Sequence, residues 1–137
     1  MTNLDTLENA SLQLLLKGDD PVLEALRNQV IHIISREREF TGVGYYVHFA
    51  LADNAPRLPN EPSFGFGDVV ADIDGLEFGV AIQLWVERGR LACLEVVTYD
   101  ETWPVEIGAF SIRYEKAPRD LDALRATTNW PRFISFR

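Results

Sequence analysis

Residues 80–99, VAIQLWVERGRLACLEVVTY, contain two runs of alternating side chains joined by Arg88-Gly89. Alternation with a period of two is typical of β-strands, and a glycine in so short a connection is typical of a tight hairpin turn. If Glu87 lies opposite Arg90, both faces of this hairpin are largely apolar. Because a sheet with one face in water carries polar residues on that face, we expect both faces of this sheet to be covered.

The same alternation extends the sheet on both sides of the hairpin. Further strands are expected at 43–51, 68–74 and 110–114, which gives an antiparallel meander of about five strands. Asp74-Gly75 marks the turn that precedes the hairpin. Three prolines interrupt residues 53–64, and since proline donates no backbone hydrogen bond, we expect a loop there.

Helical patterns precede the sheet. Leucines recur at mostly helical spacing between Leu4 and Leu15. Asp20-Pro21 then supplies a capping carboxylate followed by proline at the first helical position, so a second helix begins here. We expect this helix to run to about Glu39, and a further short helix at 118–126.

The last residues, WPRFISF at 130–136, are too aromatic for a free end. We expect this tail to dock on the domain or on a partner. The predicted fold is therefore a single α+β domain over residues 1–137, with N-terminal helices packed on the antiparallel sheet and a short C-terminal helix with a docked tail.

Composition limits the classes of partner. The chain has 137 residues, which suits one domain, and a formal net charge of -8. Nucleic acids and anionic membranes are both negatively charged, so neither is an expected partner. One cysteine excludes an internal disulfide, and the first residues have no basic segment of a signal peptide. We therefore expect a cytoplasmic protein.

The negative charge is concentrated in the middle of the chain. Residues 66–108 contain nine acidic residues and two arginines, whereas residues 109–137 have a net charge of +3. This segment is either a solvated sheet surface or a face for a basic protein partner. The candidates for such a partner surface are Asp72, Asp74, Glu77, Asp100, Glu101 and Trp103. The loop at 99–104 suits recognition of a basic surface, but it also suits an ordinary turn held in place by Trp103, and the second interpretation is favoured.

No catalytic motif is present. The chain lacks a GxxxxGK phosphate loop, a Cys-x-x-Cys pair and a His-Glu-x-x-His sequence, so we expect no catalytic residue, no metal and no cofactor. Cys93 lies between apolar neighbours of a strand, which favours a buried structural thiol over a reactive one.

Three residues are candidates for a ligand pocket: Glu95, His48 and Tyr46. The hairpin pairing proposed above places Glu95 on an apolar face beside Ile82, where a carboxylate is costly unless it is paired. An ion pair with an arginine such as Arg113 would explain Glu95 without any function. A general acid or ligand-binding group in a pocket is the alternative.

Six short stretches carry a resemblance to known proteins. They are GDV at 67–69, DGLEFG at 74–79, LWVERGRL at 84–91, LE at 94–95, TYDE at 98–101 and WP at 103–104. This strand and turn pattern resembles small uncharacterised bacterial domains, some of which are similar to immunity proteins of polymorphic toxin systems. The resemblance implies a small intracellular domain, with neutralisation of a toxin as one role.

Three functions remain open on the sequence alone. The first is a non-enzymatic acidic binding protein, in its most concrete form an immunity-type protein that covers a basic active site. The second is a small-ligand-binding domain or small enzyme, with Glu95, His48 and Tyr46 in a pocket between helices and sheet. The third is a homo-oligomeric structural domain, such as a homodimer, because both sheet faces are expected to be apolar.

Overall fold

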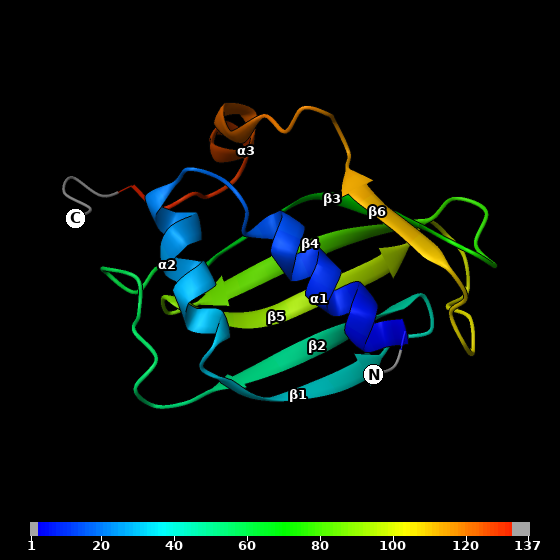
Figure 1. Ribbon diagram of the computed structural model, residues 1–137, viewed down its shortest axis with the longest axis horizontal. Helices are drawn as coiled ribbons and strands as arrows, with labels where there is room; N and C mark the ends of the chain where they lie inside the picture. The colour runs from blue at the N-terminus through cyan, green and yellow to red at the C-terminus, as the bar shows by residue number, and fades with distance from the viewer. Residues whose placement is uncertain (1–2, 133–137) are drawn as a thin grey trace.

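Three helices and six strands make up the computed structural model, which describes residues 3–132 (Figure 1). The helices are α1 (Asn3–Leu15), α2 (Pro21–Val30) and α3 (Leu121–Thr127). The strands are β1 (Ile33–Phe40), β2 (Gly44–Leu51), β3 (Phe64–Ile73), β4 (Val80–Glu87), β5 (Arg90–Thr98) and β6 (Phe110–Tyr114). The α+β class is confirmed, with six strands rather than about five.

All six strands belong to one antiparallel sheet in the order β1-β2-β5-β4-β3-β6. The segment β3-β4-β5 is the expected meander. The β1–β2 hairpin is added at one side, where β2 pairs with β5, and β6 returns to pair with β3 at the other side. The sheet is therefore built from two consecutive units rather than from one continuous meander.

The sixth strand comes from a segment that we expected to be helical. The second helix begins as predicted, because the Asp20 carboxylate accepts hydrogen bonds from the backbone N–H groups of Val22 (2.8 Å) and Leu23 (3.1 Å). It ends at Val30, and β1 occupies Ile33–Phe40, so the prediction of a helix to Glu39 was wrong. β-Branched residues dominate 30–34, and they favour a strand over a helix.

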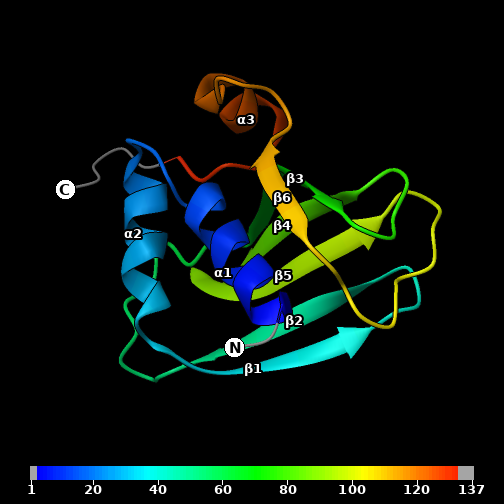
Figure 2. The same ribbon diagram turned by 45° about the vertical axis from the view of Figure 1, so that its right-hand side comes forward.

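The helices lie on one face of the sheet. In Figure 1, α1 and α2 cross in front of the strands, and Figure 2 shows α3 above the end of β6. The core lies between these helices and the sheet, and its largest fully buried side chains include Leu7, Leu15, Leu23, Leu26, Tyr45, Phe66, Ile82, Leu84 and Leu94. The opposite face of the sheet, which we call the open face, is covered by none of these helices.

The described part of the tail docks on the helix side. The Trp130 side chain is buried, and its ring centroid lies 5.0 Å from that of Phe66 and 5.6 Å from that of Phe64. Trp130 therefore does not cover the second sheet face, which was one of the roles expected for the tail. Phe133 and Phe136, the other aromatic residues of that prediction, lie outside the described residues.

A β-bulge in the central hairpin changes which residues face the core. Val86 lies opposite Leu91, as the sequence predicted, but Trp85 lies opposite Cys93. Ala92 is therefore the extra residue, and every position after it is displaced by one. Because a shift of one residue turns each side chain to the other face, the pairing predicted beyond Ala92 was wrong.

The corrected register makes the open face partly polar. Leu94 and Val96 point into the core, whereas Glu95 points to the open face, opposite Gln83. The expectation that both faces are largely apolar was therefore wrong, because it depended on the unbulged pairing.

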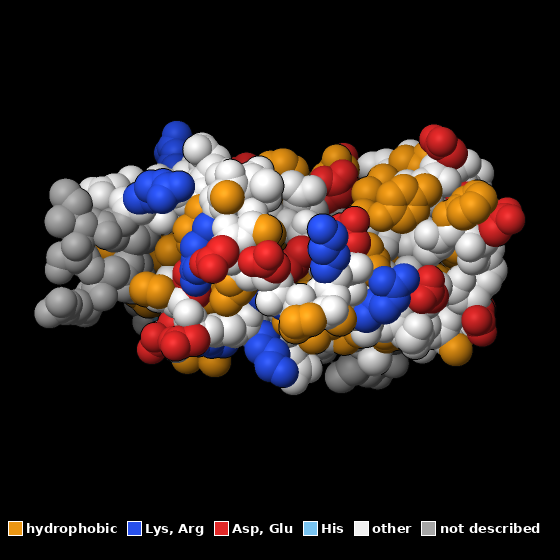
Figure 3. Space-filling view, turned by 90° about the horizontal axis from the view of Figure 1, so that it is seen from above, with side chains coloured by type: hydrophobic (Ala, Val, Ile, Leu, Met, Phe, Trp, Pro, Cys, Tyr) orange, Lys and Arg blue, Asp and Glu red, His pale blue; other side chains and the backbone are white. Residues whose placement is uncertain are grey.

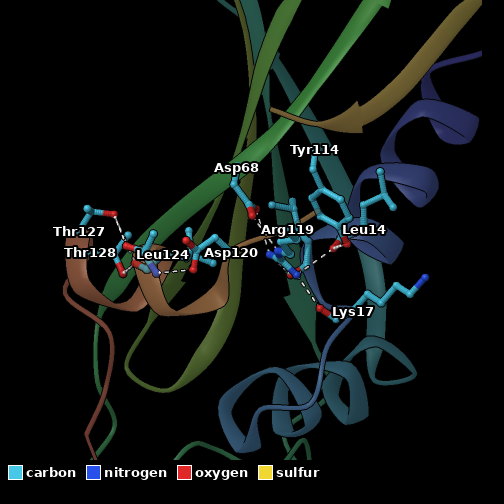
Figure 4. Close-up of polar contacts among 11 residues, drawn as sticks. Leu14, Lys17, Asp68, Tyr114, Arg119, Asp120, Leu124, Thr127 and Thr128 are labelled. Atoms are coloured by element: carbon cyan, nitrogen blue, oxygen red, sulfur yellow. Dashed lines mark hydrogen bonds and ion pairs between the residues drawn. The ribbon is translucent and has the colours of Figure 1, made fainter. Parts of the chain in front are cut away.

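Arg119 joins the C-terminal end of α1 to strand β3, next to the edge strand β6 (Figure 4). Its guanidinium donates to both carboxylate oxygens of Asp68 on β3, at 2.7 and 3.0 Å. It also donates to the backbone carbonyls of Leu14 and Leu15 at the C-terminal end of α1, at 3.2 and 2.9 Å. The Tyr114 ring stacks on it, with the guanidinium carbon 4.8 Å from the ring centroid. The positive charge thus compensates the orphan carbonyls at a helix end.

Candidate functional site

Three connections come together at one end of the sheet, at the right of Figure 1. They are the β1–β2 turn, the β3–β4 turn and the β5–β6 loop. With the last residue of β1, they form a surface of residues 40–43, 74–79 and 99–109, which we call the turn end. It contains five carboxylates and no lysine, arginine or histidine; the carboxylates belong to Asp74, Glu77, Asp100, Glu101 and Glu106.

The turn end also holds most of the exposed apolar side chains. Among the described residues, eight large hydrophobic side chains are exposed, and five of them are here: Phe40, Val43, Phe78, Tyr99 and Val105. Figure 3 shows hydrophobic and acidic side chains next to one another at its right-hand end. A monomeric protein rarely exposes a cluster of this kind unless it docks something.

A small cleft lies at the edge of this surface. It has a volume of about 320 Å³ and lies where the β5–β6 loop meets β1 and the start of α1. Its walls include the side chains of Phe40, Trp103, Val105 and Glu106. A cleft with both apolar walls and a carboxylate among its lining residues suits a long side chain with an apolar stem and a cationic head.

Two of the predicted partner-surface residues hold the turn end together. The Glu101 carboxylate accepts hydrogen bonds from the backbone N–H groups of Glu77 (2.8 Å) and Phe78 (3.0 Å), so it ties two connections to each other. The Trp103 ring packs 5.1 Å from the ring of Tyr45, and its backbone N–H donates to the carbonyl of Gly42. These contacts are the ones expected of a residue that holds the loop in place.

The structure brings most of the predicted partner surface together, with one exception. Asp74, Glu77, Asp100, Glu101 and Trp103 all belong to the turn end. Asp72 lies instead on the open face of β3, where its carboxylate is 3.7 Å from the guanidinium of Arg113.

Sequence reasoning missed the exposed apolar residues of the turn end. Phe78 lies between Asp74-Gly75 and Gly79, and an aromatic residue inside such a turn was the available signal. Val105 follows Trp103-Pro104 in a loop and is fully exposed. Phe40 and Val43 were not recognised because the adjacent strand β1 was expected to be helical.

Glu95, Tyr46 and His48 do lie close together, but not in the expected place. Tyr46 is opposite Glu95, and His48 is opposite Cys93, so all of these side chains point to the open face. This corrects the expected pocket between helices and sheet, because the helices cover the other face. The Glu95 carboxylate accepts a hydrogen bond from the indole N–H of Trp85 at 3.1 Å, rather than pairing with Arg113.

Neighbouring charges and burial change the acidity of two groups on the open face. The negative charge of Glu95 is the main cause that raises the pKa of the Tyr46 phenol above its ordinary value. Burial, and then the charge of Glu95, raise the pKa of the Cys93 thiol to about 11. Cys93 is therefore a protonated, unreactive thiol at neutral pH.

A second cavity lies on the helix side of the molecule. This groove of about 720 Å³ runs between α1 and α2 and has apolar walls from Leu12, Leu16 and Val30. Lys17 and Arg27 are among its polar lining residues. Within residues 3–132, no group of three or more His, Cys, Asp or Glu side chains is arranged to hold a metal ion. No helix in the same range is long and apolar enough to cross a membrane.

The molecule is thus a six-stranded antiparallel sheet with helices on one face, an acidic and apolar surface at one end, and a partly polar open face. No family model, curated protein or solved structure matches the chain.

Proposed function

We propose that this protein is a non-enzymatic binding protein that docks a basic protein partner through its turn end. One observation carries the proposal: five of the eight exposed large hydrophobic side chains of the described residues share a surface with five carboxylates and no cation. Exposed apolar groups release water when they are covered, while carboxylates attract and orient a cationic partner.

The turn end has the parts of a protein interface. Phe40, Phe78 and Tyr99 supply aromatic contact area, which protein interfaces favour. The cleft beside Trp103 offers a recess for one anchoring side chain of the partner. The carboxylates around these residues would increase the association rate at low ionic strength and lose this effect as salt screens them.

In its most concrete form, the proposal is an immunity-type role in the cytoplasm. The protein would neutralise a basic toxin by covering its active site, so that inhibition is steric and needs no reaction. The resemblance of the strand and turn pattern at 67–104 to immunity proteins supports this form, as does the acidic turn end.

A small-ligand function is the second candidate, and the groove between α1 and α2 favours it. Lys17 and Arg27 beside apolar walls suit a small anionic amphipathic molecule. None of the residues Glu95, Tyr46 and His48 lines this groove. A face-to-face homodimer through the open face is less well supported, because it would bring like charges such as Glu95 of the two copies together.

The test compares two triple variants of equal charge change. Asp74→Lys/Glu77→Lys/Glu106→Lys reverses three exposed charges of the turn end, and Glu24→Lys/Glu115→Lys/Asp122→Lys reverses three exposed charges elsewhere. Partners are captured from host lysate with the wild type, identified and purified, and their affinity is measured at several salt concentrations.

We expect a basic partner whose binding to the turn-end variant is at least tenfold weaker, with a smaller salt dependence, while the control variant binds as the wild type. Equal binding to both variants would contradict the turn end as the interface. Binding of a small anionic molecule, lost on changing Arg27, would favour the groove instead. For the immunity form, co-expression of the protein must restore growth to cells that produce the captured partner.

A further inference from the structure

The open face carries one aromatic side chain that is held flat against the sheet. Trp85 lies opposite Gly65 on β3, and the six-membered ring of its indole covers this glycine. A side chain at position 65 would collide with the ring, because its Cβ would lie 2.4 Å from Cε3 and Cζ3. The inner face of the indole therefore rests on backbone, and 38% of the residue's surface stays exposed.

Glu95 fixes the indole from its edge. Its Oε1 accepts the Nε1–H of Trp85 at 3.1 Å, so the carboxylate lies at the rim of the ring. Tyr46, directly opposite Glu95 on β2, adds a phenol next to the same carboxylate. We call Trp85, Glu95 and Tyr46 the Trp85 platform. It is preformed, because pairing across three strands sets its positions before any ligand binds.

The surroundings of the platform are negatively charged. Strand pairing places five carboxylates on the open face, which belong to Glu37, Glu39, Asp72, Glu87 and Glu95. The same pairing places two arginines there, fewer than the carboxylates: Arg113 lies beside Asp72, and Arg90, opposite Glu87, donates to the backbone carbonyl of Ala52. His48 is next to the platform, but its Nε2 is already engaged with Glu39 at 2.8 Å. An anionic ligand would be repelled from this face, and a cation would be attracted.

We propose that the Trp85 platform binds the guanidinium group of an arginine side chain of a protein partner. A guanidinium is planar and stacks on an aromatic face, whereas an ammonium is a compact, strongly hydrated point charge. Stacked on the indole, its N–H groups reach toward the rim, where the Glu95 carboxylate accepts them. Tryptophan is the aromatic side chain that attracts cations most strongly.

Other occupants fit the open face less well. A second copy of this chain would present carboxylates to carboxylates if the two open faces met. A neutral sugar could stack on the indole but would gain nothing from the surrounding charge.

The inference deepens the proposed function, on which it rests, by naming a chemical group of the basic partner. It can fail separately, because the platform and the turn end are different surfaces.

The experiment uses small probes, so that no partner needs to be known. Nuclear magnetic resonance of the full chain follows the indole N–H of Trp85, assigned with Trp85→Phe, during titration with N-acetylarginine amide. N-acetylcitrulline amide is the neutral probe of the same shape, and N-acetyllysine amide tests the preference for guanidinium. Glu95→Gln keeps an oxygen for the indole N–H but removes the charge. Glu24→Gln removes an exposed charge on α2 and is the control.

We expect a saturable shift of the Trp85 indole signal with the arginine probe, and an affinity roughly threefold lower for citrulline and for the Glu95→Gln variant. Glu24→Gln should bind as the wild type, and so should the turn-end triple variant. An equal response to arginine and citrulline, or unchanged binding by Glu95→Gln, would overturn the proposal. So would a stronger response to a neutral sugar such as methyl glucoside. If the arginine response persists while the turn-end variant binds the captured partner normally, only the proposed function fails.

Discussion

Arg119 and Asp68 form a two-pronged ion pair that joins the segment after β6 to β3. The guanidinium Nε lies 2.7 Å from one carboxylate oxygen, and Nη2 lies 3.0 Å from the other. Only 8% of the Arg119 side chain is exposed, so solvent screens this pair weakly. Because the same guanidinium also donates to carbonyls at the end of α1, it couples three elements.

Replacing Arg119 should destabilise the fold strongly. Arg119→Met keeps an apolar stem but leaves Asp68 and the α1 carbonyls without their donor. We expect the free energy of unfolding to fall by about 2–4 kcal/mol, since a partly buried charge loses its partner. Urea denaturation measures the loss. The matched control is Arg113→Met, which breaks the exposed 3.7 Å pair with Asp72 and should cost at most about 1 kcal/mol. Similar losses for both variants would show that burial does not strengthen the Arg119 pair.

Glu101 should matter for local order at the turn end more than a surface carboxylate would. Glu101→Ala removes both acceptors for the N–H groups of Glu77 and Phe78 and should cost about 1–2 kcal/mol. Hydrogen exchange at these two amides should become faster, while amides in β5 keep their protection. Asp100→Asn is the control, because asparagine tolerates the positive φ of 59° at this position. Unchanged exchange at both amides in Glu101→Ala would refute the tie between the two connections.

Hydrophobic periodicity was enough to predict most of the elements. It failed at β1, where Arg36 and Arg38 occupy the inward positions that an apolar residue would normally take. Both contact Glu8, which is fully buried on α1: Arg38 Nε lies 2.7 Å from its carboxylate. A strand whose inward side chains are charged has no apolar alternation, so its pattern resembles a polar helix end.

Only the part of the candidate site that depends on local sequence could be predicted. The acidic loops were visible because turn residues and carboxylates are local in sequence. The place of Glu95 was not visible, because a single bulge at Ala92 decides which face each following residue occupies. The neighbours of Trp85, and hence the platform, depend on that bulge and on pairing between distant strands.

Alkylation of Cys93 should be slow at neutral pH and should accelerate as the pH rises. Its raised pKa of about 11 leaves only about one thiolate in a thousand at pH 8, and the thiolate is the reactive form. The rate of reaction with iodoacetamide should therefore increase about tenfold per pH unit up to pH 11. Glu95→Gln removes a charge that raises this pKa, so the variant should react faster at a given pH.

The same shift affects stability at alkaline pH. Because the folded state raises the pKa of Cys93, the stabilising contribution of the neutral thiol is complete below its ordinary pKa of about 9 and is lost as the pH rises through about 11. The wild type should therefore lose stability to urea between pH 9 and 11 more steeply than Cys93→Ala. Rapid reaction of Cys93 with iodoacetamide at pH 7 would contradict both predictions, because it would show an activated thiol instead of a protonated one.

Gly65→Ala should displace the Trp85 indole without changing any charge. The new Cβ would lie 2.4 Å from two ring carbons, so the indole must move and its 3.1 Å hydrogen bond to Glu95 must lengthen or break. We expect a loss of about 1–2 kcal/mol in the free energy of unfolding, together with a shift of the Trp85 indole N–H signal.

A double-mutant cycle separates this collision from an ordinary effect of alanine in a strand. In a Trp85→Ala background the ring is absent, so adding Gly65→Ala should cost little, because alanine itself fits an extended strand. A coupling energy of about 1 kcal/mol or more between the two positions is the expected result of the cycle, measured by urea denaturation. If the cost of Gly65→Ala is the same in both backgrounds, the indole does not rest on Gly65. Binding of the arginine probe should also be weaker in Gly65→Ala than in the wild type, since the stacking face is then no longer held flat beside Glu95.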